Sequence, residues 1–363
     1  MKKLYIVSIF LLSMFLSYDF AEAQNRRRGS RISKQKNRMI SRYRGGSVGD
    51  FSRKRYISIG GSLSAFNYFG DLAPKPSALS TDISFTRPGI GIVGLYRFGP
   101  RYSVRGTLSY GRLKGDDFDS ADPADENARY RYVRNLQFRN NIFELAVTGV
   151  VDIIPNMGTF VARPTFVPYV FGGLAVFYHN PQALVPETDV NNGNAAFENA
   201  GQWVDLEPLG TEGQYISGSG VSPYKKIQIA IPLGIGVRYR VNHALDLSFE
   251  IGYRQLFFDY IDDVSGNYVD LGLFTDDLTR ALSDRSREAN AVESGEVRDL
   301  SVANRIITYT GADGRTYQVI AGYGDAHPES IRGNASDNDI YVVTSFQLTY
   351  ILGGSLFGGA KYR

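Results

Sequence analysis

The chain has 363 residues, no cysteine and a formal net charge of +3, from 40 Lys and Arg against 37 Asp and Glu. The absence of cysteine excludes a disulfide framework, a thiolate metal site and a lipid-anchored N-terminal cysteine. The length alone would allow two or three soluble domains. However, 24 Tyr and 22 Phe beside a single Trp, together with 39 Gly, favour many strands with aromatic ends and tight turns.

Residues 1–23 have the three parts of a signal peptide. Lys2 and Lys3 form a basic start, residues 4–16 are apolar, and residues 21–23 (Ala-Glu-Ala) provide a cleavage site. The apolar run is shorter than the roughly 20 residues of a membrane-spanning helix. No stretch of 18 apolar residues follows it, so we expect an exported protein in which any membrane crossing uses strands.

Residues 24–55 form a basic arm with almost no apolar content. The arm has 12 Lys or Arg and one acidic residue, Asp50. Such a segment cannot bury enough surface to fold alone, so we expect disorder or folding on a partner. It is either a solvated leader or a docking arm for an acidic periplasmic protein or anionic lipid, and we expect no nucleic-acid partner. The candidate docking residues are Arg26, Arg27, Arg28, Arg31, Lys34, Lys36, Arg38, Arg42 and Arg44.

Eight later segments alternate apolar and polar residues, which is the pattern of a strand with two different faces. In the clearest one, Leu247, Phe249 and Ile251 alternate with polar residues after a turn at residues 241–244. The predicted strands are Tyr56–Asn67, Gly89–Phe98, Tyr102–Leu113, Phe138–Asp152, Phe166–Tyr178, the two halves of the hairpin Gln228–Phe258, and Ile340–Leu352.

The connections between these strands alternate in length. Short turns join strands two to three and six to seven, a longer turn joins four to five, and long segments join the others. This asymmetry is typical of outer-membrane barrels. We predict an all-β, eight-stranded antiparallel transmembrane β-barrel over residues 56–352, with short periplasmic turns and long outer loops. We also expect a partly folded last loop (259–339) and a periplasmic C-terminal tail (353–363). Two further strands hidden in the long loops would instead allow a narrow channel.

Aromatic residues fall near both ends of the predicted strands, as in the two girdles of a membrane barrel. At the short-turn end they are Tyr56, Phe98, Tyr102, Phe166, Tyr239 and Tyr350. At the long-loop end they are Phe66, Tyr110, Phe138, Tyr178, Tyr224 and Phe257. Since a soluble sandwich has no reason to place them there, we expect outer-membrane lipid to surround the strands.

The polar faces of the strands place charged residues inside the barrel. Eight strands leave a lumen just wide enough for side chains to fill, and each unpaired charge there would cost several kcal/mol. Four basic and four acidic residues therefore predict a salt-bridged lumen charge network and argue against a diffusion pore. The residues are Arg105, Glu144, Asp152, Arg238, Arg240, Asp246, Glu250 and Arg254.

Two loops carry candidate local features. Acidic residues crowd the third connection, namely Asp116, Asp117, Asp119, Asp122, Asp125 and Glu126. Such oxygen ligands suit a hard cation such as calcium, but the spacing matches no defined calcium loop, so we expect a solvated acidic loop without metal or cofactor. In the last loop, Thr275 is expected to cap a helix that ends at about Ala289. Ile306–Tyr309 and Thr316–Ile320 are expected to form a hairpin.

No catalytic motif is present in the sequence. Neither a nucleophile elbow, a phosphate loop nor an HExxH motif occurs. Asp262, Asp263, Asp325 and His327 are the residue types of an outer-membrane protease, but their spacing specifies no catalytic geometry. We predict that the protein is not an enzyme.

Three motifs resemble a known family. They are Asn67-Tyr68-Phe69-Gly70-Asp71-Leu72-Ala73-Pro74, residues 79–89 (LSTDISFTRPG), and residues 115–118 (GDDF) followed by 130–136 (YRYVRNL). Together they resemble the PorG-like outer-membrane barrel family of Bacteroidota over most of residues 55–352. Within the first motif, residues 68–71 also suit a loop-closing turn, since Gly70 permits a positive φ and Asp71 can bond to the backbone.

The resemblance implies an accessory barrel of the type IX secretion system, which associates with a periplasmic ring formed by a lipoprotein and its partner. We therefore expect a structural or docking component of a type IX protein secretion assembly. Its partners would be periplasmic or outer-membrane proteins of that complex, and the basic arm lies on the side that such a contact requires. The alternative is an adhesin-like surface barrel whose outer loops bind an external ligand.

Overall fold

The computed structural model describes residues 55–72, 85–159, 161–336 and 338–352. The chain divides into two units, Met1–Ser52 and Arg53–Arg363. The expected signal peptide, the basic arm apart from Arg55, and the C-terminal tail lie outside the described residues. Among the described residues, no helix is both long and apolar enough to cross a membrane.

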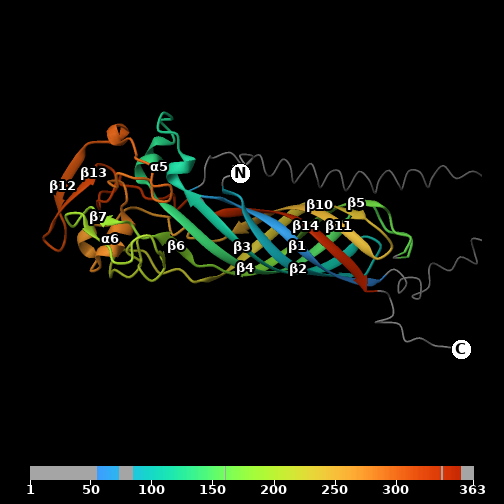
Figure 1. The fold of residues 1–363 in the computed structure, drawn as a ribbon. Helices are drawn as coiled ribbons and strands as arrows, with labels where there is room; N and C mark the ends of the chain where they lie inside the picture. Colours follow the sequence, from blue (N-terminus) through green and yellow to red (C-terminus); the bar gives the residue numbers. More distant parts are fainter. Residues whose placement is uncertain (1–54, 73–84, 160, 337, 353–363) are drawn as a thin grey trace, which may run out of the picture. The chain divides into compact units, whose positions relative to one another are not determined.

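Eight strands form a closed antiparallel barrel, as the sequence predicts. Their order is β3-β2-β1-β14-β11-β10-β5-β4, and an additional pairing of β3 with β4 closes the sheet (Figure 1). The strands are β1 (Tyr56–Phe69), β2 (Arg87–Arg97), β3 (Tyr102–Asp116), β4 (Gln137–Asp152), β5 (Phe166–Tyr178), β10 (Ile227–Arg240), β11 (Leu245–Leu256) and β14 (Ile340–Leu352).

The two ends of the barrel differ. The turns at residues 98–101, 153–165 and 241–244 lie at one end, called here the turn end. The first and last strands pair from Ile57 opposite Leu352 to Phe69 opposite Ile340, so both described ends of the unit are at the turn end. The described parts of the four other connections lie at the opposite end, called here the cap end, as the alternating connection lengths predict (Figure 1).

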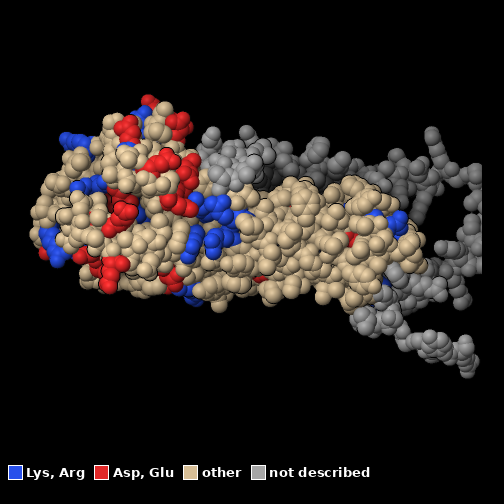
Figure 2. Space-filling view, in the orientation of Figure 1, with Lys and Arg blue, Asp and Glu red and all other residues tan. Residues whose placement is uncertain are grey.

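The outer face of the strands is apolar and the inner face is polar. Leu63 is 69% exposed, Leu174 64% and Ile90 62%, whereas Ser62 and Glu250 on the inward parity are buried. A soluble sheet buries its aliphatic face, so this inversion identifies the outer wall as a surface that faces lipid. Figure 2 shows the wall of the barrel almost free of charged side chains. The chain therefore has the architecture of a transmembrane β-barrel.

The aromatic girdles are present but smaller than predicted. Exposed aromatics are Phe98, Tyr102, Phe166, Tyr239 and Tyr350 near the turn end, and Tyr110, Tyr178 and Phe257 near the cap end. The prediction is wrong for Tyr56, Phe66 and Phe138, which have the inward parity and are buried. Tyr224 is also misplaced, because it stacks against His179 and Tyr260 in the loops.

The long connections build a folded cap. Its short strands and helices are α4 (Asp117–Ser120), α5 (Arg129–Arg134), β6 (Pro181–Leu184), β7 (Thr188–Asp189), β8 (Ala195–Ala196), β9 (Trp203–Asp205), η2 (Leu271–Leu273), α6 (Asp277–Ser283), η3 (Leu300–Val302), β12 (Ile306–Thr310) and β13 (Thr316–Ile320). β6 pairs with the upper part of β4, and β9 pairs with β6. These short strands add no ninth or tenth barrel strand.

Two expectations for the last loop are tested by these elements. The hairpin is confirmed, because β12 pairs with β13 in register from Ile306 opposite Ile320. The helix begins one residue later than predicted and is shorter than predicted. Its N-cap is Asp276, whose side chain accepts a hydrogen bond from the Thr279 N–H, and the helix ends at Ser283. Asp276 is the better cap at this position because the carboxylate reaches the N–H three residues on.

Candidate functional sites: the lumen ladder and the cap anchor

The lumen contains four stacked polar clusters, called here the lumen ladder. At the turn end, Arg163 from the turn at residues 153–165 reaches into the barrel. Its Nη2 lies 2.7 Å from Asp246 Oδ1, and its Nη1 donates to the carbonyl oxygen of His243. One arginine thus ties the two turns together.

The next cluster joins three strands around one carboxylate. Asp152 Oδ2 lies 2.6 Å from Arg97 Nη1 and 3.2 Å from Arg238 Nη1. Arg97 also donates to the carbonyl oxygens of Gly99 and Pro100. Two arginines on one buried carboxylate leave one positive charge in excess. The backbone carbonyl oxygens that contact Arg97 offset part of this charge.

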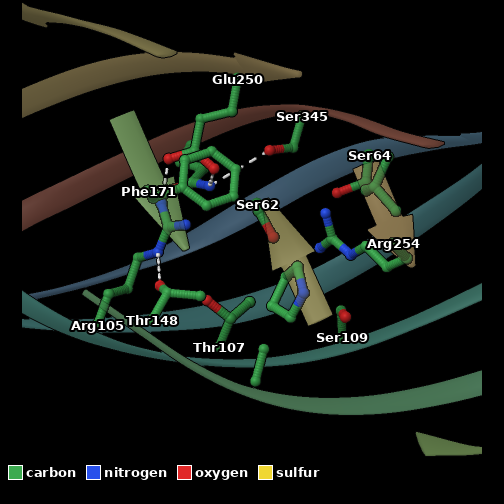
Figure 3. A pocket seen from close by; sticks show the side chains of 14 residues that line it. Ser62, Ser64, Arg105, Thr107, Ser109, Thr148, Phe171, Glu250, Arg254 and Ser345 are labelled. Carbon is green, nitrogen blue, oxygen red and sulfur yellow. Dashed lines mark hydrogen bonds and ion pairs between the residues drawn. The ribbon is translucent and has the colours of Figure 1, made fainter. Parts of the chain in front are cut away.

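The middle cluster surrounds Glu250. This carboxylate pairs with Arg105 and accepts hydrogen bonds from the Tyr169 hydroxyl and from Gln347 Nε2. The Arg105 guanidinium also lies over the Phe171 ring, 4.6 Å from its centroid (Figure 3). The Glu250 carboxylate therefore links side chains from β3, β5, β11 and β14 across the lumen.

The uppermost cluster is the pair of Glu144 and Arg254. Two hydrogen bonds of 3.0 and 3.1 Å join them, and the Tyr341 hydroxyl donates to Glu144 Oε2 at 2.7 Å. The described lumen holds cavities of about 20 Å³ beside Arg105 and about 10 Å³ beside Asp152. Such cavities hold about one water molecule each. The barrel is filled by its own side chains.

The structure places all the predicted lumen residues in these pairs except Arg240. Arg240 lies at the rim of the turn end and donates to Val161 O and Thr165 Oγ1. Two arginines were missed. Arg97 has the inward parity of β2, so strict alternation with outward Ile92 and Tyr96 would have found it. Arg163 lies in a turn, where no periodic pattern exists.

The cap is anchored to the barrel by a buried arginine on α5. Arg134 makes a two-pronged contact with Asp117, at 2.7 and 2.8 Å. It also donates to the carbonyl oxygens of Asp71 and Arg332. The arginine thus joins the connections β1–β2, β3–β4 and β11–β14, and we call this group the cap anchor.

The acidic third connection is not simply solvated, contrary to the expectation. Asp117 is fully buried in the cap anchor. Asp116 caps α4 by accepting from the N–H groups of Phe118 and Asp119. Asp122 and Asp125 accept local backbone hydrogen bonds. Within the described ranges no group of three or more His, Asp or Glu side chains is arranged to hold a metal ion.

A second buried arginine organises the last loop. Arg332 Nη1 lies 3.0 Å from Glu212 Oε1 and 2.7 Å from the carbonyl oxygen of Asp263. Glu212 also accepts from the N–H groups of Ser265 and Gly266. No sequence pattern indicates this pair, because the two residues are distant in the chain and lie in irregular segments.

The motif at the end of β1 forms a clasp between barrel and cap. The Tyr68 hydroxyl lies 2.6 Å from Asp262 Oδ2 and 2.7 Å from Asp339 Oδ1. A hydroxyl has one hydrogen, so it donates to one carboxyl group while the other must be protonated to complete the second bond. Burial raises the pKa of both carboxyl groups well above the usual range, and it raises the pKa of nearby Asp259 to about 8.

The other motif residues have structural contacts. Asn67 Nδ2 donates to Thr86 Oγ1, and Asp71 Oδ2 accepts from the Asn334 N–H as expected. Phe69 ends β1 and is partly buried. Gly70 does not use the positive φ that a glycine permits, since it is not among the described glycines that have one. Glycine is needed there because a Cβ atom would overlap the Tyr68 hydroxyl and the Asp339 carboxyl group.

The residues of a protease-like site are held apart by other contacts. Asp262 belongs to the clasp, and Asp263 accepts hydrogen bonds from Thr211 and Tyr224. Asp325 accepts from Ser330 and from the backbone N–H of His327. The described residues therefore show no imidazole–carboxylate pair between His327 and these acids.

The fold and the filled lumen define the class as an eight-stranded transmembrane β-barrel with a folded cap.

The family model "Domain of unknown function (DUF6089)" matches residues 52–199. None of the curated proteins matches the chain. Among solved structures, outer membrane protein OprG from Pseudomonas aeruginosa is 9% identical, with 82% of this chain and 96% of that chain covered and a TM-score of 0.34. Neisserial surface protein A is 9% identical, with 81% of this chain and 96% of that chain covered and a TM-score of 0.33. A major outer membrane protein from Thermus thermophilus is 10% identical, with 82% and 99% covered and a TM-score of 0.34.

Proposed function

We propose that this chain is a non-enzymatic outer-membrane barrel that acts as a structural or docking component of a type IX protein secretion assembly. The observation that supports a structural or docking role, and not a role as a channel, is the lumen ladder. Buried ion pairs fill the barrel from end to end and leave water-sized cavities between them. A barrel without a passage works through its two ends. The finer assignment to type IX secretion is supported by the resemblance of residues 67–74, 79–89 and 115–136.

In this proposal the turn end faces the periplasm and the cap faces outward, as the arrangement of short turns and long loops in bacterial barrels supports. The basic arm precedes β1, which begins at the turn end, so in this proposal it is on the periplasmic side, where a ring protein or outer-membrane component of the complex can bind it. The charge of the arm supports an acidic partner surface. Residues 1–23 act as the signal peptide that directs the chain there.

The experiment compares the two ends of the molecule. One variant replaces the nine candidate docking residues of the arm with Gln, which keeps its length. A second variant deletes residues 274–333 from the cap. The proposal expects the arm variant to lose co-purification of periplasmic ring proteins from outer membranes and to reduce secretion, while the barrel still inserts. A silent arm variant beside an inactive cap variant would overturn it.

The second candidate function is the binding of an external ligand by the cap, as in an adhesin. The observation in its favour is that the cap has hydrophobic clusters of its own, one around Tyr132 and Tyr268 and one around Leu271 and Tyr317. A defined surface is what an external ligand would need. This candidate expects the purified barrel to capture such a ligand after deletion of the arm, and no capture after deletion of residues 274–333.

A further inference from the structure

A pair of arginines lies where the cap meets the lipid-facing wall. Arg112 on β3 and Arg139 on β4 share the outward face of the paired strands, in which Arg112 is opposite Asn141 and Lys114 is opposite Arg139. Figure 2 shows Lys and Arg side chains gathered at this boundary, between the acid-rich cap and the uncharged wall.

The two guanidiniums have neutral hydrogen-bond partners. Arg112 Nε donates to Asn141 Oδ1 at 2.8 Å, and Arg139 Nε donates to Gln182 Oε1 at 2.9 Å. Among the described residues, neither arginine has a carboxylate within ion-pair distance. Lys114, which is opposite Arg139 in the strand pair, is itself paired with Glu293 at 2.6 Å. Within the part of the chain that the structure describes, both arginines donate through Nε alone, so their terminal nitrogens are available for an anion.

The side chains around the pair fix its geometry. The Arg139 guanidinium lies over the Trp203 ring, 4.1 Å from its centroid. β9, which carries Trp203, pairs with β6, and β6 pairs with β4 at Arg139. A stacked guanidinium held by an amide loses little freedom when it binds a phosphate, and arginine can contact phosphate oxygens with two N–H groups at once.

The distance of Arg112 and Arg139 from the aromatic edge of the lipid-facing wall indicates where a bound anion would come from. Tyr110 and Phe143 are exposed neighbours, with ring centroids 4.6 Å apart, and mark the upper edge of the lipid-facing wall. Arg112 is two residues above Tyr110, and Arg139 is four residues from Phe143 in the same direction. At about 3.3 Å per residue and a typical strand tilt, they lie roughly 5 and 10 Å above the aromatic edge. This is the level of lipid headgroups.

We propose that Arg112, Arg139 and Trp203 form a binding site for the phosphate group of a phosphorylated glycolipid in the outer leaflet. The guanidiniums bind the phosphate, and the Trp203 ring lies beside the sugar to which it is attached. The proposal uses the orientation given under the proposed function, with the cap outward. A bound headgroup would relieve the repulsion between the two arginines and fasten β6 and β9 to the membrane surface.

The test measures lipid retention by native mass spectrometry of the full chain purified in detergent. The probes are bis-phosphorylated lipid A, dephosphorylated lipid A, phosphatidylglycerol and inorganic phosphate. We expect retention of phosphorylated lipid A by the native protein, a loss of about tenfold for each of Arg112→Gln and Arg139→Gln, and partial rescue by Arg139→Lys. Arg240→Gln removes the same charge at the turn end and is expected to leave retention unchanged.

Heat-dependent gel mobility confirms that each variant is folded before its lipid content is compared. The proposal would be overturned by unchanged retention in a folded variant that carries both Arg112→Gln and Arg139→Gln. It would also be overturned by equal retention of dephosphorylated lipid A, by preferred retention of phosphatidylglycerol, or by displacement of the lipid by inorganic phosphate alone. The secretion assay on the arm variant is independent of this result. Failure of lipid binding would leave the docking function standing, and a silent arm variant would leave the phosphate site standing.

Discussion

The lumen ladder and the clasp beneath the cap bury acidic side chains in opposite ways. In the lumen, Glu144 and Glu250 each face a guanidinium. In the clasp, Asp262 and Asp339 share the Tyr68 hydroxyl, and neither has an ion-pair partner among the described residues. A charged acid needs a buried cation, whereas an acid without one must keep its proton. The comparison indicates that the barrel is held by charge pairs and the clasp by protons.

The largest effect is expected from breaking a rung of the lumen ladder. Arg254→Met leaves the buried Glu144 carboxylate with the Tyr341 hydroxyl as its remaining partner. The loss should lower the free energy of unfolding by about 3–5 kcal/mol, since an uncompensated buried charge remains. Urea unfolding in detergent micelles measures it. Replacing Glu144 by Met as well should recover most of the loss, and a double variant as unstable as the single one would contradict the pairing.

A smaller and local effect is expected at the cap anchor. Arg134→Lys keeps the positive charge but loses the two-pronged contact with Asp117 and the reach to the carbonyl oxygens of Asp71 and Arg332. We expect a loss of about 1–3 kcal/mol, confined to the cap. Amide hydrogen exchange should show faster exchange in residues 257–339 with unchanged exchange in the strands. Faster exchange throughout the barrel would mean that the two regions are not separate.

The close approach at Gly70 can be tested with a single methyl group. In Gly70→Ala the Cβ atom overlaps the Tyr68 hydroxyl and the Asp339 carboxyl group, so the clasp must shift at a cost of about 1–3 kcal/mol. Gly94→Ala is the matched control on β2, because nothing lies within 4 Å of its Cβ position. Limited proteolysis of the cap should accelerate in the first variant alone. Equal rates in both would show that the clasp is not tightly packed.

Of these variants, Asp262→Asn is expected to change the stability of the cap least at acidic pH. Its effect is specific to the pH dependence of that stability. The raised pKa values of Asp262, Asp339 and Asp259 mean that the folded clasp binds more protons than the unfolded chain. Its stability is therefore fully present below the ordinary carboxyl pKa near 4, and it is lost as the pH rises through the raised values, which reach about 8 for Asp259.

Proteolysis of the cap between pH 5 and pH 9 measures this dependence. The native protein should become more susceptible as the pH rises. The amide introduced by Asp262→Asn cannot ionise, so the variant should match the native protein at pH 5 and show a weaker pH dependence. A native cap that becomes more resistant at high pH would reverse the sign and exclude the protonated clasp.

The barrel could be predicted from the sequence because its signals are periodic. Alternation placed Phe166–Tyr178 and Ile340–Leu352 with the bounds that the structure shows. The same parity identified the inward Glu144 and Glu250. Where parity was not applied strictly, the prediction failed, because Tyr56 and Phe66 were assigned to a girdle by their aromatic character although they point inward.

The cap could not be predicted to the same depth. Arg134, Asp117, Arg332 and Glu212 lie in loops and short helices without periodicity, and their pairing depends on how four long connections meet above the barrel. Composition indicates only that the third connection is acidic. The Tyr68–Asp71 motif was singled out in the sequence, yet its role as a clasp depends on Asp262 and Asp339, which approach it only in the fold.

The conductance of the purified full chain in planar lipid bilayers measures directly whether the lumen is sealed. We expect no steady channel, because the lumen ladder fills the barrel and leaves room for single water molecules. Arg105→Ala together with Glu250→Ala, which empties the middle cluster, provides the comparison in which a narrow current becomes possible. Stable, reproducible conductance steps in the native protein would contradict a sealed barrel that works through its two ends.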